Sequence, residues 1–267
     1  MTSEHKGATL VPAVDRAVLI LQTLATHSTP LGVSDLSREL GLNKSTTHNI
    51  LNTLCHHRLI ERDDQAKTYR LGTALANLGH CVSERIDLRT VAHARLVALA
   101  HAVEETVILG TFHDGHITII DQEEAPHDVK ITAPLGRRLY YSVAAFGKIF
   151  LAAMPSDEVS KLIGAKSLRE FTSKSITKIS AYRAALTQVR EQGYAVDDEE
   201  YLDGVRAISA PINDAQGSVV AALCVVGFSA RLANGKLTGL AKQTRQTAEE
   251  ISRQLGAVEY PQWNGVG

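Results

Sequence analysis

A few segments of this 267-residue chain could bind a metal or act as nucleophiles. Residues 113–116 (HDGH) contain two histidines, but Asp-Gly between two apolar runs is typical of a β-hairpin turn, the simpler interpretation. Residues 55–57 (CHH) fall in a predicted helix, where adjacent side chains point apart. Residues 197–200 (DDEE) could bind a hard cation, yet a solvated acidic loop, with Asp197 separately facing a cavity, is simpler. Cys224 has no evident histidine or asparagine partner and is interpreted as a small core or cavity residue.

Motifs of common enzyme classes are missing from the sequence. It has no Gly-x-Ser-x-Gly, no phosphate-binding loop and no dinucleotide fingerprint. We therefore expect no catalytic residue, no metal and no cofactor. A small-molecule enzyme with a helical N-terminal domain stays open as an alternative.

A different chemistry is indicated by the polar side chains that follow Asn43. Asn43 is a good N-cap and predicts a helix from Lys44 to His57. Five polar side chains point outward from its first turns: Lys44, Ser45, Thr46, His48 and Asn49. Such groups can bond to base edges, and free backbone amides at a helix start can bind a phosphate.

The surrounding pattern supplies the elements that would position this helix. Residues 13–27 repeat apolar side chains at helical spacing, and residues 33–40 form a second short helix before Gly41. The expected buried face of the first helix comprises Val14, Ala17, Val18, Leu21 and Leu24. Residues 59–62 and 68–71 predict two strands around the polar turn 63–67. This order of elements is that of a winged helix-turn-helix, whose third helix enters the major groove.

Charge does not by itself indicate nucleic-acid binding. The chain has 28 basic and 29 acidic residues, a net charge of −1, which excludes a polybasic protein held to DNA by bulk charge. Residues 1–80 hold eight basic and seven acidic residues, a net charge of +1. Four cations are nevertheless expected on the third helix and the hairpin: Lys44, Arg62, Lys67 and Arg70. Because the domain carries so little net charge, we expect it to bind DNA with useful affinity only as a dimer or a larger assembly.

The rest of the chain has another organisation. Residues 71–103 are mostly helical with a break near residues 86–87, and strands are expected at 106–112 and 117–121 around the Asp-Gly turn. Further strands are expected near 128–133, 194–198, 205–212 and 218–227, and helices near 142–154, 156–163, 177–192 and 233–255. Antiparallel strands covered by helices predict an α+β sensor-like domain. No targeting or membrane-spanning segment is evident, and three widely spaced cysteines favour a reducing compartment, the cytoplasm.

The chain resembles IclR-family transcriptional regulators over nearly its whole length. The matching segments of the N-terminal part are 14–17 (VDRA), 41–48 (GLNKSTTH) and 69–72 (YRLG). Those of the C-terminal part are 147–148 (GK), 193–195 (GYA), 204–212 (GVRAISAPI) and 217–223 (GSVVAAL). The segments are weak individually and specific in this order and spacing.

The resemblance implies two functional domains joined by a linker. We expect a winged helix-turn-helix DNA-binding domain in residues 1–73, a linker helix in 74–87, and a GAF-like α/β effector-binding domain in 88–260. It also implies a homodimer formed through the DNA-binding domain (the head) and the linker, and often a dimer of dimers. Two departures lie in the head: Asn49 and Arg58 stand where the family commonly has Arg and Gly. A left-handed backbone at Arg58 would cost roughly 1 kcal/mol.

The resemblance also places an effector pocket in the C-terminal domain. Carried over by position, its lining becomes Ala145, Phe146, Asp197, Ala207, Cys224 and Val226, with Ile131, Leu135 and Val205 as apolar walls. Members that bind small oxo-acids have small or hydroxyl residues at several of these positions. Here the apolar lining favours an apolar or aromatic small molecule, with one polar group facing Asp197, or a small organic acid, over a tiny dicarboxylate.

We therefore expect a cytoplasmic, sequence-specific transcriptional regulator, and repression is the better expectation from the resemblance. Its partners would be double-stranded DNA with a palindromic operator and a small-molecule effector, without a membrane. The DNA-contacting residues would be Lys44, Ser45, Thr46, His48, Asn49, Arg62, Lys67 and Arg70. A ligand-binding sensor or interaction module without DNA binding stays open as an alternative.

Overall fold

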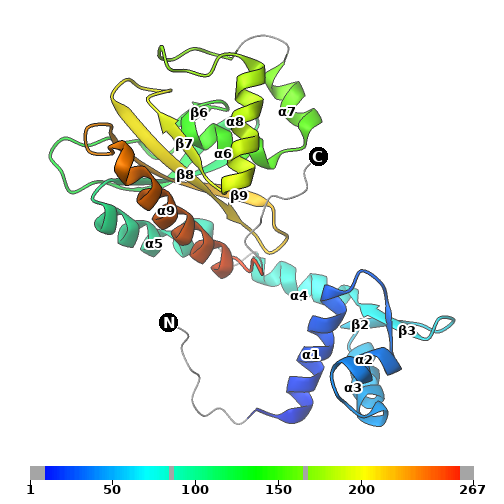
Figure 1. Cartoon of the computed structure of the whole chain (residues 1–267). Coiled ribbons are helices and arrows are strands. Elements are labelled where there is room, and N and C mark those ends of the chain that lie inside the picture. Colours follow the sequence, from blue (N-terminus) through cyan, green and yellow to red (C-terminus); the bar gives the residue numbers. More distant parts are fainter. Residues whose placement is uncertain (1–9, 84–86, 165–167, 259–267) are drawn as a thin grey trace. The chain divides into compact units, whose positions relative to one another are not determined.

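The computed structural model describes residues 10–83, 87–164 and 168–258. The chain divides into two compact units, Met1–Arg85 and Ile86–Gly267 (Figure 1). No helix within those described ranges combines the length and the hydropathy needed to cross a lipid bilayer.

The first unit is a helical domain with a small antiparallel sheet. Its elements are α1 Pro12–Thr26, β1 Leu31–Gly32, α2 Val33–Glu39, α3 Lys44–His56, β2 Ile60–Asp63, β3 Thr68–Leu71 and α4 Thr73–Ser83. The sheet order is β1-β3-β2, so the two-stranded hairpin expected from the sequence gains a third strand, β1. Its core consists of Ile20, Leu24, Leu36, Leu51, Leu54, Ile60 and Tyr69. The winged helix-turn-helix expected from the sequence is thus confirmed.

The apolar face expected for α1 is partly wrong. Ile20 and Leu24 are buried, whereas Val14 and Val18 are 61% and 45% exposed. A helix that buries positions 20 and 24 turns positions 14 and 18 toward its flank. The N-terminal part of α1 therefore presents apolar side chains to solvent.

Two left-handed residues shape the ends of the helices in this unit. Gly41 has a φ of 63°, as expected for the tight turn between α2 and α3. Arg58 has a φ of 57° directly after α3, so the strain expected there from a non-glycine residue is present.

The second unit is built on a six-stranded antiparallel sheet with the order β6-β5-β4-β9-β8-β7. Its strands are β4 Thr106–His113, β5 His116–Glu123, β6 Arg138–Tyr140, β7 Ala195–Asp198, β8 Val205–Asn213 and β9 Val219–Phe228. Its helices are α5 Leu88–Val103, α6 Ala144–Ala153, α7 Ser156–Ile163, α8 Ile179–Gln192 and α9 Asn234–Gln254.

Helices cover both faces of this sheet (Figure 1). One core packs α5 and α9 against the sheet, and the other packs α6, α7 and α8 against its opposite face. The central strands β8 and β9 are consequently buried on both sides and are almost continuously apolar. The four later helices expected from the sequence agree with the observed ones to within about two residues.

The β4–β5 hairpin turns where Asp-Gly predicts it. Asp114 and Gly115 both have positive φ values, 49° and 72°, as a type I′ turn requires. The pairing shifts by one residue between Leu109 and Gly110, because Ile120 is an extra residue in β5.

This bulge redirects the side chains of β5. Ile119 belongs to the core under α6, whereas Asp121, two residues on, faces α5. There its buried carboxylate accepts a hydrogen bond from His93 at 2.8 Å and pairs with Arg89 at 3.4 Å. An uninterrupted strand would keep positions 119 and 121 on one face.

The strand expected near residues 128–133 is wrong. That segment is not part of the sheet, and β6 pairs with β5 in its place. Side chains hold the segment instead: Thr106 Oγ1 donates to the carbonyl oxygen of Ile131, and Gln122 Oε1 accepts the amide of Ala133. Side-chain hydrogen bonds thus take the place of the strand pairing expected for this segment.

The helical segment expected between the domains is present on both sides of residues 84–86, which lie outside the described residues. α4 ends at Ser83, and α5 is capped by Asp87, whose carboxylate accepts the amide of Arg89 at 3.1 Å. The expected break near residues 86–87 falls partly in that undescribed gap.

Candidate functional site

α3 presents a polar face to solvent. Its buried residues are Thr47, Leu51 and Leu54, which anchor it to the first unit's core. Of the residues expected to contact DNA, Lys44, Ser45, His48 and Asn49 are exposed and Thr46 is half-buried. One helix thus carries hydrogen-bonding groups outward and apolar groups inward.

The first turn of α3 is fixed by Asn43. Its side-chain oxygen accepts the amide of Thr46 at 2.8 Å, and its carbonyl oxygen accepts the Oγ1 hydroxyl of Thr47 at 3.0 Å. This cap satisfies one amide at the helix start. The amides of Lys44 and Ser45 precede the capped one, at the positive end of the helix dipole, where a phosphate can bind.

The polar face continues beyond the residues expected from the sequence. Asn52 and His56 are exposed one and two turns after His48, and Asn52 Nδ2 lies 3.3 Å from His48 Nδ1. The i, i+4 spacing from His48 was a signal that could have identified both.

The two wing arginines are engaged by carboxylates. Arg70 donates from Nε and Nη2 to Glu61 Oε2 at 3.1 and 2.8 Å, and Arg62 Nε lies 3.3 Å from Asp64 Oδ1. These pairs are solvent-exposed, so each contributes only about 0–1 kcal/mol. A phosphate can therefore replace the carboxylates.

Lys44 and Lys67 differ from the arginines. Within the described part of the chain, neither lysine has a carboxylate partner. Lys67 ends the wing turn with a φ of 54°, and Asp63 holds that turn by accepting the amides of Gln65 and Ala66 at 2.9 and 3.0 Å. These two hydrogen bonds lower the pKa of Asp63, which stays ionised.

The second unit contains a cavity of about 90 Å³ beneath α6. Eight of the nine residues expected to form an effector pocket line it: Ile131, Ala145, Phe146, Asp197, Val205, Ala207, Cys224 and Val226. Leu135 is not among the lining residues and is 49% exposed. The structure thus brings together residues that are up to 95 positions apart in the sequence.

Sequence reasoning missed several members of this lining. Thr132, Arg137 and Tyr201 add polar groups, and Arg137 Nη2 lies 3.4 Å from the Tyr201 hydroxyl. Leu202 adds an apolar group. These residues belong to irregular segments, where no periodicity indicates the direction of a side chain.

Phe146 fills one side of the cavity because Gly110 leaves room for it. A β-carbon on Gly110 would lie only 3.1 Å from the Phe146 ring. A glycine in the middle of β4 therefore makes a close approach possible.

Asp197 is the buried carboxyl of this cavity, with 2% of its surface exposed. Desolvation by burial raises its pKa to about 7, and the charge of Glu200 adds to this effect. The backbone amides of Glu200 and Tyr201 and the charge of Lys148 oppose it. Its Oδ1 accepts the Glu200 amide at 2.6 Å.

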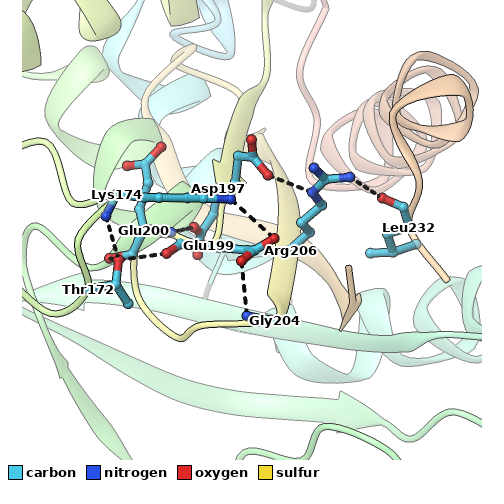
Figure 2. Close-up of polar contacts among 9 residues, drawn as sticks. Thr172, Lys174, Asp197, Glu199, Glu200, Gly204, Arg206 and Leu232 are labelled. Carbon is cyan, nitrogen blue, oxygen red and sulfur yellow. Dashed lines mark hydrogen bonds and ion pairs between the residues drawn. The ribbon is translucent and has the colours of Figure 1, made fainter. Parts of the chain in front are cut away.

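The acidic run 197–200 is not the solvated loop that was the simpler sequence interpretation. Asp198 pairs with Arg206 at 2.6 Å and Glu199 with Lys174 at 3.3 Å (Figure 2). Glu200 pairs with the buried Lys148. Lys148 Nζ also donates to the carbonyl oxygen of Val196 at 2.8 Å. Each of these acids has a specific partner, and the run is part of the structure around the cavity.

Metal binding finds no support in the residues that the structure describes. They contain no cluster of three or more histidine, cysteine, aspartate or glutamate side chains able to hold an ion. Cys224 is buried, and burial raises the pKa of its thiol further from the physiological range.

A winged helix with an outward polar third helix, together with a largely apolar cavity in a separate unit, is the architecture of a ligand-responsive transcriptional regulator. Two family models match the chain: the IclR helix-turn-helix domain at residues 13–64 and the bacterial transcriptional regulator IclR C-terminal domain at residues 80–253. The chain belongs to the IclR family. It is a DNA-binding transcriptional regulator and not an enzyme.

Relatives of known role agree with this assignment. The chain is 32% identical over 247 residues to the HTH-type transcriptional regulator XynR of Escherichia coli K12, covering 92% of this chain and 98% of XynR. It is 32% identical over 257 residues to the HTH-type transcriptional repressor AllR of the same strain, covering 96% and 94%.

Solved structures share the fold over nearly the whole chain. The repressor BlcR of Agobacterium tumefaciens matches with a TM-score of 0.74 and 27% identity, covering 94% of this chain and all of BlcR. HmgR of Pseudomonas aeruginosa matches with a TM-score of 0.75 and 26% identity, covering 93% and 99%.

The raised pKa of Asp197 predicts a stability that depends on pH. The folded carboxyl holds its proton up to about pH 7, whereas the unfolded chain releases it near 3.8. The folded state therefore binds more protons in this window, and the free energy of unfolding falls as pH rises. Relative to Asp197→Asn, we expect the wild type to lose about 1.4 kcal/mol per pH unit between pH 5 and pH 7.

Urea denaturation of both proteins at pH 5, 6, 7 and 8 measures this difference. Asp198→Asn is the matched control, because it removes the neighbouring, more exposed carboxylate. Parallel pH profiles for the wild type and Asp197→Asn would contradict a raised pKa.

Proposed function

We propose that this protein is a cytoplasmic repressor that binds a palindromic operator as a homodimer or a dimer of dimers and responds to a small effector in the cavity. Two observations together carry the proposal: α3 in the first unit presents polar side chains to solvent, and a cavity in the second unit is lined by eight of the expected residues. AllR and BlcR, which the chain resembles, are both described as repressors.

The residues of the DNA-binding surface fall into two roles, according to the chemistry of their side chains. Ser45, Thr46, His48 and Asn49 contact base edges and carry sequence preference. The four cations Lys44, Arg62, Lys67 and Arg70 contact phosphates and position the head. Residues 1–73 form the DNA-binding domain, 74–87 the linker, and 88–260 the effector domain.

Exposed apolar side chains support dimerisation through the first unit. Leu10, Val11, Val14 and Val18 are each at least 45% exposed at the start of α1. Several large apolar side chains in water on one short segment mark an interaction surface. Dimerisation also doubles the contacts of a head whose net charge is close to zero.

The effector is a small molecule with an apolar or aromatic body and one polar group, or a small organic acid. Phe146, Val205 and Cys224 supply an apolar wall, and Asp197 supplies the polar contact. Arg137 lines the same cavity and offers a partner for an acid. Effector binding changes operator affinity only by favouring one of two protein states over the other.

Binding to the DNA upstream of its own coding region tests the proposed function. We expect a discrete gel-shift complex that resists non-specific competitor DNA. Lys44 and Lys67 have no carboxylate to give up when they bind phosphate, and a dimer carries four such lysines. These lysines should dominate the salt dependence, so we expect the logarithm of the binding constant to fall with the logarithm of salt concentration with a slope of about −4. A failure to select any sequence from a randomised DNA library would favour the sensor without DNA binding.

His48→Ala and Lys67→Ala should have separable effects on operator binding. His48→Ala should reduce discrimination between operator and mutated operator by about tenfold while leaving the salt slope unchanged. Lys67→Ala should weaken binding to both sequences similarly and make the slope shallower by about 2, because a dimer carries two copies. Equal loss of discrimination in the two variants would contradict the assigned roles.

Phe146→Leu should alter which compounds release the operator complex. The smaller side chain enlarges the cavity, so we expect bulkier members of a panel of aromatic and aliphatic acids and alcohols to become active, with operator affinity unchanged. Phe150→Leu is the matched control, because Phe150 is buried one turn further along α6 and does not line the cavity. An identical response profile for both variants would contradict the cavity as the effector site.

A further inference from the structure

One wall of the cavity is the turn between β7 and β8, residues 199–204, here called the cavity turn. Tyr201 and Leu202 line the cavity from this turn, and Leu202 is also 46% exposed to solvent. The turn therefore separates the cavity from solvent by a single layer of residues. Because the cavity measures only about 90 Å³, an effector of more than a few atoms requires this wall to move.

A second loop holds the cavity turn from outside (Figure 2). Thr172 Oγ1 donates to the carbonyl oxygen of Glu199 at 2.7 Å and lies 3.2 Å from that of Glu200. Ser175 Oγ donates to the Glu200 carbonyl oxygen at 2.6 Å. These hydroxyls thus bind the backbone of the turn, whatever its side chains are.

The same loop adds two weaker contacts. The Phe171 ring meets the Tyr201 ring edge to face at 5.1 Å, and Lys174 pairs with Glu199 at 3.3 Å. None of the described residues 168–178 lines the cavity. The described part of the loop therefore acts on an occupant of the cavity indirectly, and its hydrogen bonds to the turn are its most direct connection.

The backbone of the cavity turn is strained at Glu199. Glu199 has a φ of 64°, in the left-handed region that an ordinary side chain disfavours. Its carboxylate accepts the Gly204 amide at 3.2 Å, which closes the turn on itself. Thr172 is buried, so water is not at hand to replace its bond to Glu199.

We propose that Thr172 and Ser175 are positioning residues that latch the cavity turn closed, and that release of their hydrogen bonds opens the cavity to its effector. This inference rests on the proposed effector role of the cavity. It adds a step to ligand binding: the latch must open before the effector enters, and it closes again over an effector that fits.

Cys224 makes the latch measurable without an effector. Its thiol lines the cavity and is 3% exposed, so a small reagent such as methyl methanethiosulfonate reaches it only when the cavity opens. Cys55→Ser and Cys81→Ser in the full-length chain leave Cys224 as the single thiol. Mass spectrometry then gives the rate of its modification.

A reporter on the opposite face of the sheet measures global unfolding. Ser252 is fully buried in α9 and belongs to none of the cavity lining. In a chain whose three cysteines are serine, Ser252→Cys places an isosteric thiol there. Its modification requires the domain core to open.

Thr172→Val together with Ser175→Ala should raise the modification rate of Cys224 at least tenfold and leave that of the Ser252→Cys reporter unchanged. Thr187→Val should change neither rate, because Thr187 bonds only to its own helix, at the carbonyl of Arg183. Thr172→Ser, which retains the hydroxyl, should behave as the wild type.

Two results would overturn the latch. Equal acceleration of both thiols would mean that Thr172 and Ser175 support the whole domain, and an unchanged Cys224 rate would mean that they do not restrain the turn. If the double variant does not fold, Thr172→Val alone serves the same comparison. Gel shifts with the same variants test DNA binding separately, so failure of the latch is distinguishable from failure of the proposed function.

Discussion

The placement of the Asp197 carboxyl in an apolar interior is the constraint on which the second unit depends. Burial of a carboxyl is costly unless its polar neighbours compensate. The Glu200 amide is held against it by the turn between β7 and β8, and Lys148 reaches from α6 to the same turn. The cavity, the turn and the contacts around it therefore form one interdependent arrangement, centred on a single titratable group.

The two units solve different physical problems. The first must present polar groups outward from a short helix, and it relies on local interactions such as the Asn43 cap. The second must hold a largely apolar cavity in shape, and it relies on central strands buried on both faces. DNA recognition thus requires little more than surface chemistry, whereas effector recognition requires the whole α/β core.

Local features could be predicted from the sequence, and long-range pairings could not. Asn43, Gly41 and the Asp-Gly hairpin act within a few residues, so their types suffice. The partners of the acidic run lie as far as 52 positions away, and nothing near Glu200 indicates Lys148. Residues 128–133 form no strand, and the exposure of Val14 and Val18 depends on which side of α1 meets the core. Family resemblance supplied the cavity lining that periodicity alone did not.

The bulge at Ile120 makes the pairing of β5 a determinant of chemistry. With this extra residue, β5 sends Ile119 to the cavity and Asp121 to the helix α5 on the far side. Regular pairing that kept Ile120 within the ladder would put position 121 on the same face as Ile119 and leave Arg89 and His93 without their carboxylate. It would also place a second carboxyl on the side of the sheet that holds Asp197, so that a change in pairing, with every amino acid retained, would make the cavity more acidic.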